Sequence, residues 1–140
     1  MGKINLTRVL SGGLFAGLVL NVGEFVLNGI ILAQQWSAFI AETGLGETGA
    51  VQALSFIIVT FLVGIGLVWI YAAIRPRFGP GPKTAVIAGL TVWAIGWLFI
   101  GTSFYISGIS PAGIAITSII WGLFEVPVAA IAGAWLYRED

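Results

Sequence analysis

The sequence predicts an all-α, polytopic membrane protein: a four-transmembrane-helix bundle with a short amphipathic segment in an outer loop. Of its 140 residues, 59% are hydrophobic and only 9% are charged, whereas soluble domains carry about 25% charged residues. The mean hydropathy is +1.05. Such a chain cannot cover a water-facing surface, so the lipid bilayer is its expected solvent and first partner. We expect residues 1–140 to form a single integral membrane domain.

Four apolar runs are each long enough to cross the hydrocarbon core, which takes about 20 residues of α-helix. Helices are expected because lipid offers the backbone no hydrogen-bond partners. In chain order the runs cover about residues 9–32, 50–74, 84–106 and 112–137. The third and fourth runs are joined by only a few residues, 107–111, which predicts an antiparallel helical hairpin.

The longest loop, between the first and second runs, carries a short amphipathic pattern. Trp36, Phe39 and Ile40 are spaced i, i+3, i+4, which predicts a short helix lying in the outer interface. Gly44 and Gly46 are expected to end it. A lid over a cavity is the alternative interpretation.

The connection between the second and third runs is rich in proline, glycine and cations. Pro76 is expected to end the second helix. Arg75, Arg77 and Lys83 are expected to contact anionic headgroups. Docking of a cytoplasmic partner on these three cations is the alternative.

The charges predict one orientation. A four-span topology places all six basic residues on one side: Lys3, Arg8, Arg75, Arg77, Lys83 and Arg138. The opposite loops carry only Glu42 and Glu47 as charged residues. By the positive-inside rule both termini are cytoplasmic, and the expected location is an inner, or plasma, membrane of the bacterial type.

Aromatic residues near the ends of the runs are expected to anchor the protein at the two membrane interfaces. The residues expected at the cytoplasmic interface are Trp69, Tyr71, Trp135 and Tyr137. Those expected at the outer interface are Trp36 and Tyr105.

Two glutamates, Glu24 and Glu125, lie near the middle of the first and fourth runs. A charged side chain at the bilayer centre costs about 2.5–3.5 kcal/mol on insertion scales. The two runs cross in opposite directions, yet both carboxyls fall within about one helical turn of the midplane. They meet if the first and fourth helices pack together, and no Lys or Arg of the chain reaches that depth.

Each glutamate belongs to a stripe of polar and small residues. In the first run, Asn21, Glu24 and Asn28 are three and four residues apart and share one face, which Gly13 and Gly17 extend as a GxxxG pair. A stripe of this kind is expected to face protein rather than lipid.

The fourth run has a similar stripe in which Trp121, Glu125 and Ala129 share a face. Ala129 and Gly133 are expected to pack closely against another helix. Pro127 removes a backbone donor and frees a carbonyl near Glu125.

The third run contains two tryptophans, Trp93 and Trp97, too deep for the interfacial belt. Each indole N–H needs an acceptor, and a carboxyl or the Leu123 carbonyl would serve. An aromatic box for a lipophilic cation is the alternative.

Three roles are open for the glutamates. As neutral acids they could hydrogen-bond one helix to another, at about 0.6 kcal/mol on average, with Asn21, Asn28 and Trp121 as partners. They could bind a proton, a metal cation or an organic cation. They could also pair with a basic residue of another subunit.

Composition disfavours several other classes of function. The chain has no Cys and no His, and its one Met is Met1, so the common ligands of haem, zinc and di-iron sites are missing. We expect no cofactor and no resident metal. A nucleic-acid partner is not expected because the formal net charge is zero and no basic face is present.

The favoured hypothesis is therefore a non-enzymatic helical-bundle subunit that self-associates or joins a larger membrane complex. The alternative is a small proton- or cation-coupled transporter or channel that uses Glu24 and Glu125. An enzyme is disfavoured, because two carboxyls without a nucleophile–base pair offer only general acid–base chemistry.

Overall fold

The computed structural model describes residues 3–138 and is all-helical, with 85% helix and no strand in the described part of the chain. Four helices are long and apolar enough to cross a membrane. In chain order they cover Leu6–Ile31, Ala50–Phe78, Pro82–Ile106 and Ala112–Leu136. This agrees with the four predicted runs, although the second helix ends at Phe78 rather than near residue 74.

Two of the long helices contain a π-helical turn. The first long helix consists of α1 (Leu6–Val26) and η1 (Leu27–Ile31). The third consists of α4 (Pro82–Trp93), η2 (Ala94–Phe99) and α5 (Ile100–Ile106). The second and fourth are α3 (Ala50–Phe78) and α6 (Ala112–Leu136). A short helix, α2 (Ala33–Thr43), precedes α3.

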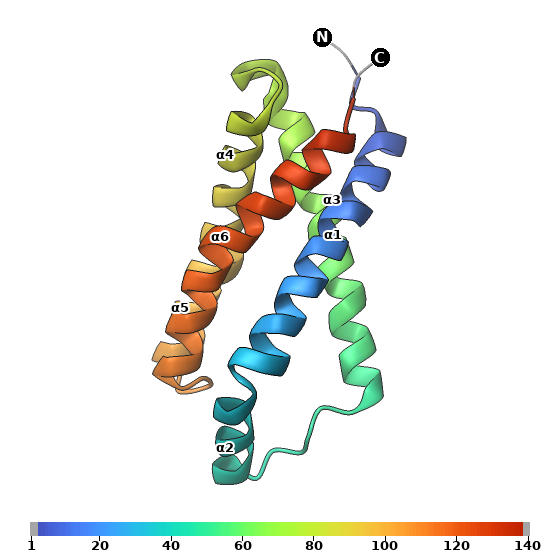
Figure 1. The fold of residues 1–140 in the computed structure, drawn as a ribbon. Helices are drawn as coiled ribbons and strands as arrows, with labels where there is room; N and C mark the ends of the chain where they lie inside the picture. Colours follow the sequence, from blue (N-terminus) through green and yellow to red (C-terminus); the bar gives the residue numbers. More distant parts are fainter. Residues whose placement is uncertain (1–2, 139–140) are drawn as a thin grey trace.

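The long helices run up and down between two ends (Figure 1). Both described chain ends and the α3–α4 turn lie at one end, which we call the terminal end. The short helix α2 and the α5–α6 turn lie at the other, which we call the α2 end. Helix α1 contacts α3 and α6, and α4 contacts the same two helices. The four helices therefore form a ring in the order α1, α3, α4, α6, and α3 and α6 also contact each other through its centre.

Glycines bring α1 and α3 into backbone contact. A Cβ atom on Gly64 of α3 would collide with Gly17 N and would lie 2.5 Å from Gly13 O. The GxxxG pair of the first helix is therefore used within the chain, against α3. Small residues allow this approach because they keep side-chain atoms out of the interface.

Helix α6 packs through small residues as well. A Cβ on Gly12 would lie 2.6 Å from Gly133 O, so α1 and α6 are in close contact near the terminal end. A Cβ on Gly89 of α4 would lie 2.6 Å from Pro127 Cα. Ala129 is fully buried. Away from the Gly12–Gly133 contact, α1 and α6 diverge toward the α2 end (Figure 1).

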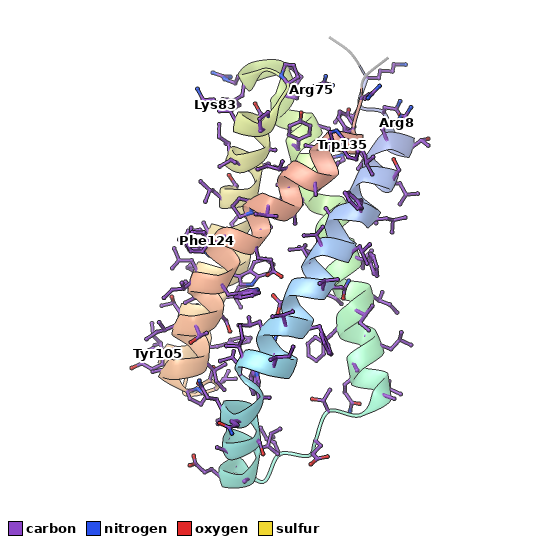
Figure 2. All side chains as sticks on the ribbon, viewed as in Figure 1. Arg8, Arg75, Lys83, Tyr105, Phe124 and Trp135 are labelled. Atoms are coloured by element: carbon purple, nitrogen blue, oxygen red, sulfur yellow. The ribbon has the colours of Figure 1, made fainter. Side chains whose placement is uncertain are left out.

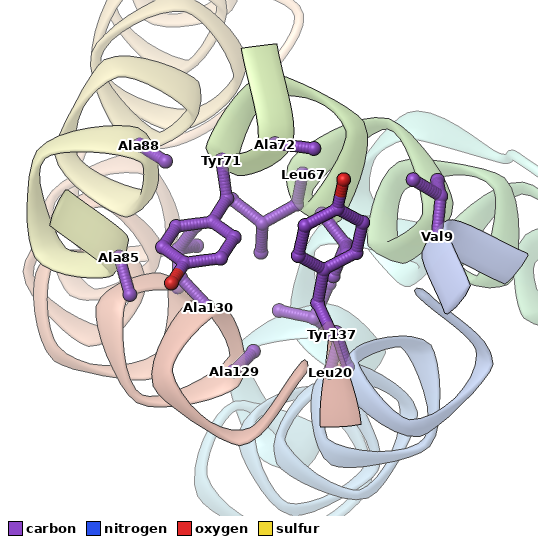
Figure 3. Packing of buried hydrophobic residues seen from close by; sticks show 13 residues of the cluster. Val9, Leu20, Leu67, Tyr71, Ala72, Ala85, Ala88, Ala129, Ala130 and Tyr137 are labelled. Carbon is purple, nitrogen blue, oxygen red and sulfur yellow. The ribbon is translucent and has the colours of Figure 1, made fainter. Parts of the chain in front are cut away.

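Tyr71 and Tyr137, expected at the cytoplasmic interface, are buried between the helices near the terminal end. Each is only 3% exposed, and their rings meet edge to face with centroids 5.9 Å apart. Figure 3 shows them between the alanine-rich faces of the helices. Small neighbours such as Ala85 and Ala129 leave room for the rings, and Tyr71 Oη accepts a hydrogen bond from Gly81 N at 3.1 Å. Burial costs little because that polar group is satisfied.

Pro76 does not end the second helix, contrary to prediction. The helix continues to Phe78, and Gly79 N donates to Arg75 O at 2.8 Å, which closes a helical turn around the proline. Pro76 lies so near the end that few helical bonds are lost. The helix stops at Gly79, whose φ of +83° is unfavourable for residues with a side chain.

The loop cations lie at the terminal end. Figure 2 shows Arg8, Arg75 and Lys83 there, and Tyr105 at the opposite end. Arg77 and Lys83 are exposed, whereas Arg75 is half-buried with its guanidinium over the Tyr137 ring, 5.6 Å from the centroid.

The amphipathic segment of the outer loop is the helix α2. It ends at Gly44, which has a φ of +67° and donates to Ile40 O at 3.0 Å. A residue at C′ in this left-handed conformation is a common helix stop. Helix α2 lies at the α2 end of the bundle. Its Trp36 and Phe39 pack against Leu27, Leu32 and Ile114.

Candidate functional site

Glu24 and Glu125 lie side by side. Glu24 is near the end of α1, Glu125 is in the middle of α6, and the two carboxyls lie close enough to influence each other without a well-formed hydrogen bond between them. Gly23 makes this possible, because a Cβ at that position would collide with Glu125 Oε1. Helices α1 and α6 therefore pack together and bring the two carboxyls close to each other, as the sequence led us to expect for neighbouring helices.

Glu24 is held from two directions. Its Oε2 accepts from Asn28 Nδ2 at 2.8 Å, and its Oε1 accepts from Trp97 Nε1 at 3.2 Å. One partner comes from η1 and the other from η2, so the acid joins two helices that are far apart in sequence. Gly122 of α6 leaves room for the Trp97 indole, because a Cβ there would lie 2.5 Å from Trp97 Cδ1.

The hydrogen bonds continue from Glu24 to α2. Asn28 Oδ1 accepts from Trp36 Nε1 at 3.0 Å. Trp36, expected at the outer interface and in the amphipathic segment, thus belongs to the site. A pocket of about 500 Å³ at the α2 end is lined by Asn28, Trp36, Glu47 and four other residues. It connects the polar network with the exposed loop that carries Glu47.

Both π-helical turns lie at this network. Leu32 N donates to Leu27 O at 2.8 Å, the i→i−5 bond that marks η1, and η1 carries Asn28. The other turn, η2, carries Trp97. Turns of this type are rare and occur frequently at functional sites. The two residues that hold Glu24 are both presented from such turns.

Glu125 differs sharply from Glu24. Its side chain is only 8% exposed, and neither carboxyl oxygen has a hydrogen-bond partner among residues 3–138. Trp121, one turn earlier on α6, lies beside the carboxyl, and its buried Nε1 likewise has no acceptor in that part of the chain. The Trp121 N–H and the Glu125 carboxyl are thus buried side by side, close enough to influence each other but without a well-formed hydrogen bond.

No cation of the described residues acts on this pair. The groups that influence the two carboxyls are Trp97, Asn28, Trp121 and the carboxyls themselves. Lys and Arg residues such as Arg8, Arg75 and Lys83 lie at the terminal end (Figure 2).

Asn21 and Trp93, two polar residues predicted to lie deep in the bundle, bind partners other than the carboxyls. Asn21 Nδ2 donates to Gly17 O at 2.9 Å and to Ile57 O of α3 at 3.4 Å, so it does not bind either carboxyl. Trp93 Nε1 donates to Ile119 O at 2.9 Å rather than to Leu123. Asn21 therefore supports the α1–α3 contact, and Trp93 fixes the third long helix on α6.

The arrangement offers two adjacent carboxyls, one held by neutral donors and one unpaired. Such a pair can share a proton or bind a cation or a hydrogen-bond donor. Among residues 3–138, acidic, histidine and cysteine side chains form no group of three that could hold a metal ion. Comparisons of the chain with family models, curated proteins and solved structures returned no match.

Proposed function

We propose that this chain is an integral membrane protein in which Glu24 and Glu125 bind a proton or a small cation between α1 and α6. Insertion into a bilayer is supported by four long apolar helices that expose large side chains, among them Phe99 at 71% and Phe124 at 67%. The cations at the terminal end support a cytoplasmic location for that end.

The state of Glu125 carries the proposal. A polar group that is buried without a hydrogen bond costs about 1–3 kcal/mol, and a charged group costs more. A carboxyl that served only to join two helices would have its oxygens paired, as Glu24 has. Both oxygens of Glu125 are buried and lack a well-formed hydrogen bond, which suits a group that accepts a proton or cation from outside the chain.

The surroundings favour access from the α2 end. The pocket lined by Asn28, Trp36 and Glu47 leads from the exposed loop to the partner of Glu24. At the terminal end, the close Gly12–Gly133 contact and the buried tyrosines fill the space between the helices. In a membrane the α2 end would face outward, so a cation would reach the carboxyls from outside.

Infrared difference spectroscopy on the full chain in lipid vesicles tests this proposal. We expect carboxyl bands to change either between acidic and alkaline buffer or on addition of Na⁺ or K⁺ at fixed pH. These bands should be absent in Glu24→Gln and Glu125→Gln. They should persist in Glu42→Gln, which alters an exposed acid on α2. Difference spectra that are the same in the wild type and both site variants would contradict the proposal.

A self-associating subunit is the second candidate, supported by the outer half of α3. Residues 51–59 of this helix are all exposed, including Val51 at 77% and Phe56 at 68%. Apart from the Asn21 contact at Ile57 O, the side chains of this segment are left uncovered by the other helices of residues 3–138, and a helix of another subunit would cover them.

Cysteine cross-linking in membranes tests self-association, because the native chain has no Cys. We expect Ser55→Cys on α3 to form disulfide-linked dimers on mild oxidation. Thr102→Cys, exposed on α5 toward the same end, should remain monomeric. The idea fails if Ser55→Cys stays monomeric or if both variants cross-link equally.

A further inference from the structure

The pocket of about 500 Å³ at the α2 end has walls from η1, from α2 and from the loop that follows α2. Its volume lies in the usual range for small-molecule sites, about 300–1,000 Å³. The turn η1 contributes Asn28, the loop contributes Glu47, and the remaining wall residues belong to α2. Asn28 also donates to Glu24 Oε2 at 2.8 Å, so a single side chain connects this pocket with the acid pair.

Glu47 is the only charged residue in the wall of the pocket. Every Lys and Arg of residues 3–138 lies near the start of α1, near the end of α6 or beside the α3–α4 turn, which are all at the terminal end (Figure 1). The basic residues of the described chain are therefore a bundle length away from Glu47. The pocket carries one negative charge without a neighbouring cation, which favours a monovalent cation as its ligand.

The rest of the wall determines which monovalent cation fits. Ile40 and Ala41 present hydrocarbon side chains, which a hydrated metal ion could not use. The half-buried Trp36 already donates its N–H to Asn28 Oδ1, so its indole offers a ligand only the ring, and aromatic rings attract cations. A divalent metal ion is disfavoured, because Ca²⁺ takes six to eight oxygen ligands and the wall has one carboxylate. A ligand that uses every part of this wall combines a positive charge with an apolar body.

We propose that the pocket binds an organic ammonium ion, with its charge near Glu47 and its apolar part against the side chains of Ile40 and Ala41. This ion would be the cation that passes by way of Asn28 to Glu24 and Glu125, so its role rests on the proposed function. In the outward orientation of the α2 end, the pocket would take the ion from the external solution.

Nuclear magnetic resonance of the full chain in nanodiscs tests this inference, with benzylamine, which is protonated at neutral pH, as the probe. The indole N–H resonances of Trp36 and Trp135 are assigned from their loss in Trp36→Phe and Trp135→Phe. We expect benzylamine to shift the Trp36 resonance saturably. Trp135, which is 73% exposed near the terminal end, should show no saturable shift. Benzyl alcohol has the same ring without the charge, and should need an about two- to fivefold higher concentration for half of the Trp36 shift.

Two matched pairs of variants locate the ligand in the pocket. Glu47→Gln should raise the half-saturating benzylamine concentration about two- to fivefold, the contribution of an exposed ion pair. Glu42→Gln removes the same charge from an exposed position of α2 outside the wall, and should leave that concentration unchanged. Ala41→Leu fills part of the pocket and should weaken binding. Ala38→Leu, exposed on the same helix outside the wall, should not.

Several outcomes overturn the inference: a Trp36 resonance that does not shift saturably, equal shifts of Trp36 and Trp135, equal potency of benzyl alcohol, or equal behaviour within either pair of variants. The result is separable from that of the infrared experiment. Carboxyl bands that respond to protons or cations without benzylamine binding in the pocket refute only the ammonium ion. Binding in the pocket without responsive bands refutes only the proton or cation site.

Discussion

Alanine at position 64 should force α1 away from α3 and destabilise the protein by about 3 kcal/mol. The added methyl would meet Gly17 N, Gly17 Cα and Gly13 O, which are all backbone atoms. A side chain can rotate away from a clash, but two helix backbones can relieve this one only by separating. Separation would also strain the bond from Asn21 Nδ2 to Ile57 O, which joins the same two helices.

The chain offers a matched control two residues away. A Cβ on Gly66, in the same helix, would have no neighbouring atom within 4 Å. Thermal unfolding in one detergent, followed by far-ultraviolet circular dichroism, should give a lower midpoint for Gly64→Ala than for wild type. Gly66→Ala should match or exceed wild type, because alanine favours helix over glycine by roughly 0.5–1 kcal/mol. Equal midpoints for the two variants would argue against backbone contact between α1 and α3.

Substitution of each glutamate by glutamine should affect the stability of the protein differently. Glutamine at position 24 offers one acceptor where two hydrogen bonds are now received, so its NH₂ must face either Trp97 Nε1 or Asn28 Nδ2. We expect a loss of about 1–3 kcal/mol in the free energy of unfolding. Glutamine at position 125 breaks no hydrogen bond in the described chain, so the loss of stability should be smaller than for Glu24→Gln.

The same unfolding measurement, combined with the infrared bands, separates these roles. Glu125→Gln is expected to lower the thermal midpoint less than Glu24→Gln does, and both variants are expected to lose the proton or cation response. Glu42→Gln, on the exposed face of α2, should change neither. Equal destabilisation by the two site substitutions would mean that Glu125 has partners in the native state that resemble those of Glu24.

The main architecture could be predicted from the sequence because composition leaves few alternatives. Four apolar runs separated by turns predict four long helices. Because Glu24 and Glu125 lie at similar depths in antiparallel runs, their contact depended only on whether the first and fourth helices are neighbours. The prediction that Pro76 ends the second helix was wrong, because a helix tolerates a proline that lies close to its end.

Other features of the site leave no trace in a sequence pattern. A run that is apolar all round does not tell which side faces another helix, so the burial of Tyr71 and Tyr137 was missed. The π-helical turns depend on tertiary contacts, and no residue type marks an i→i−5 bond. Trp36 was assigned to the interface because its partner, Asn28, lies eight residues earlier, across the break between η1 and α2 at Leu32.

Asn28 couples the acid pair to the short helix in one orientation only. Its amide nitrogen donates to Glu24 and its amide oxygen accepts from Trp36. Turning the amide over would set NH₂ against the indole N–H and oxygen against the carboxylate, breaking both bonds at once. The side chain therefore fixes how Trp36, and with it α2, is linked to Glu24. If a proton or cation drew the carboxylate away from Asn28, that link would be reduced to the bond from Asn28 Nδ2 to the Glu24 backbone carbonyl at 3.1 Å.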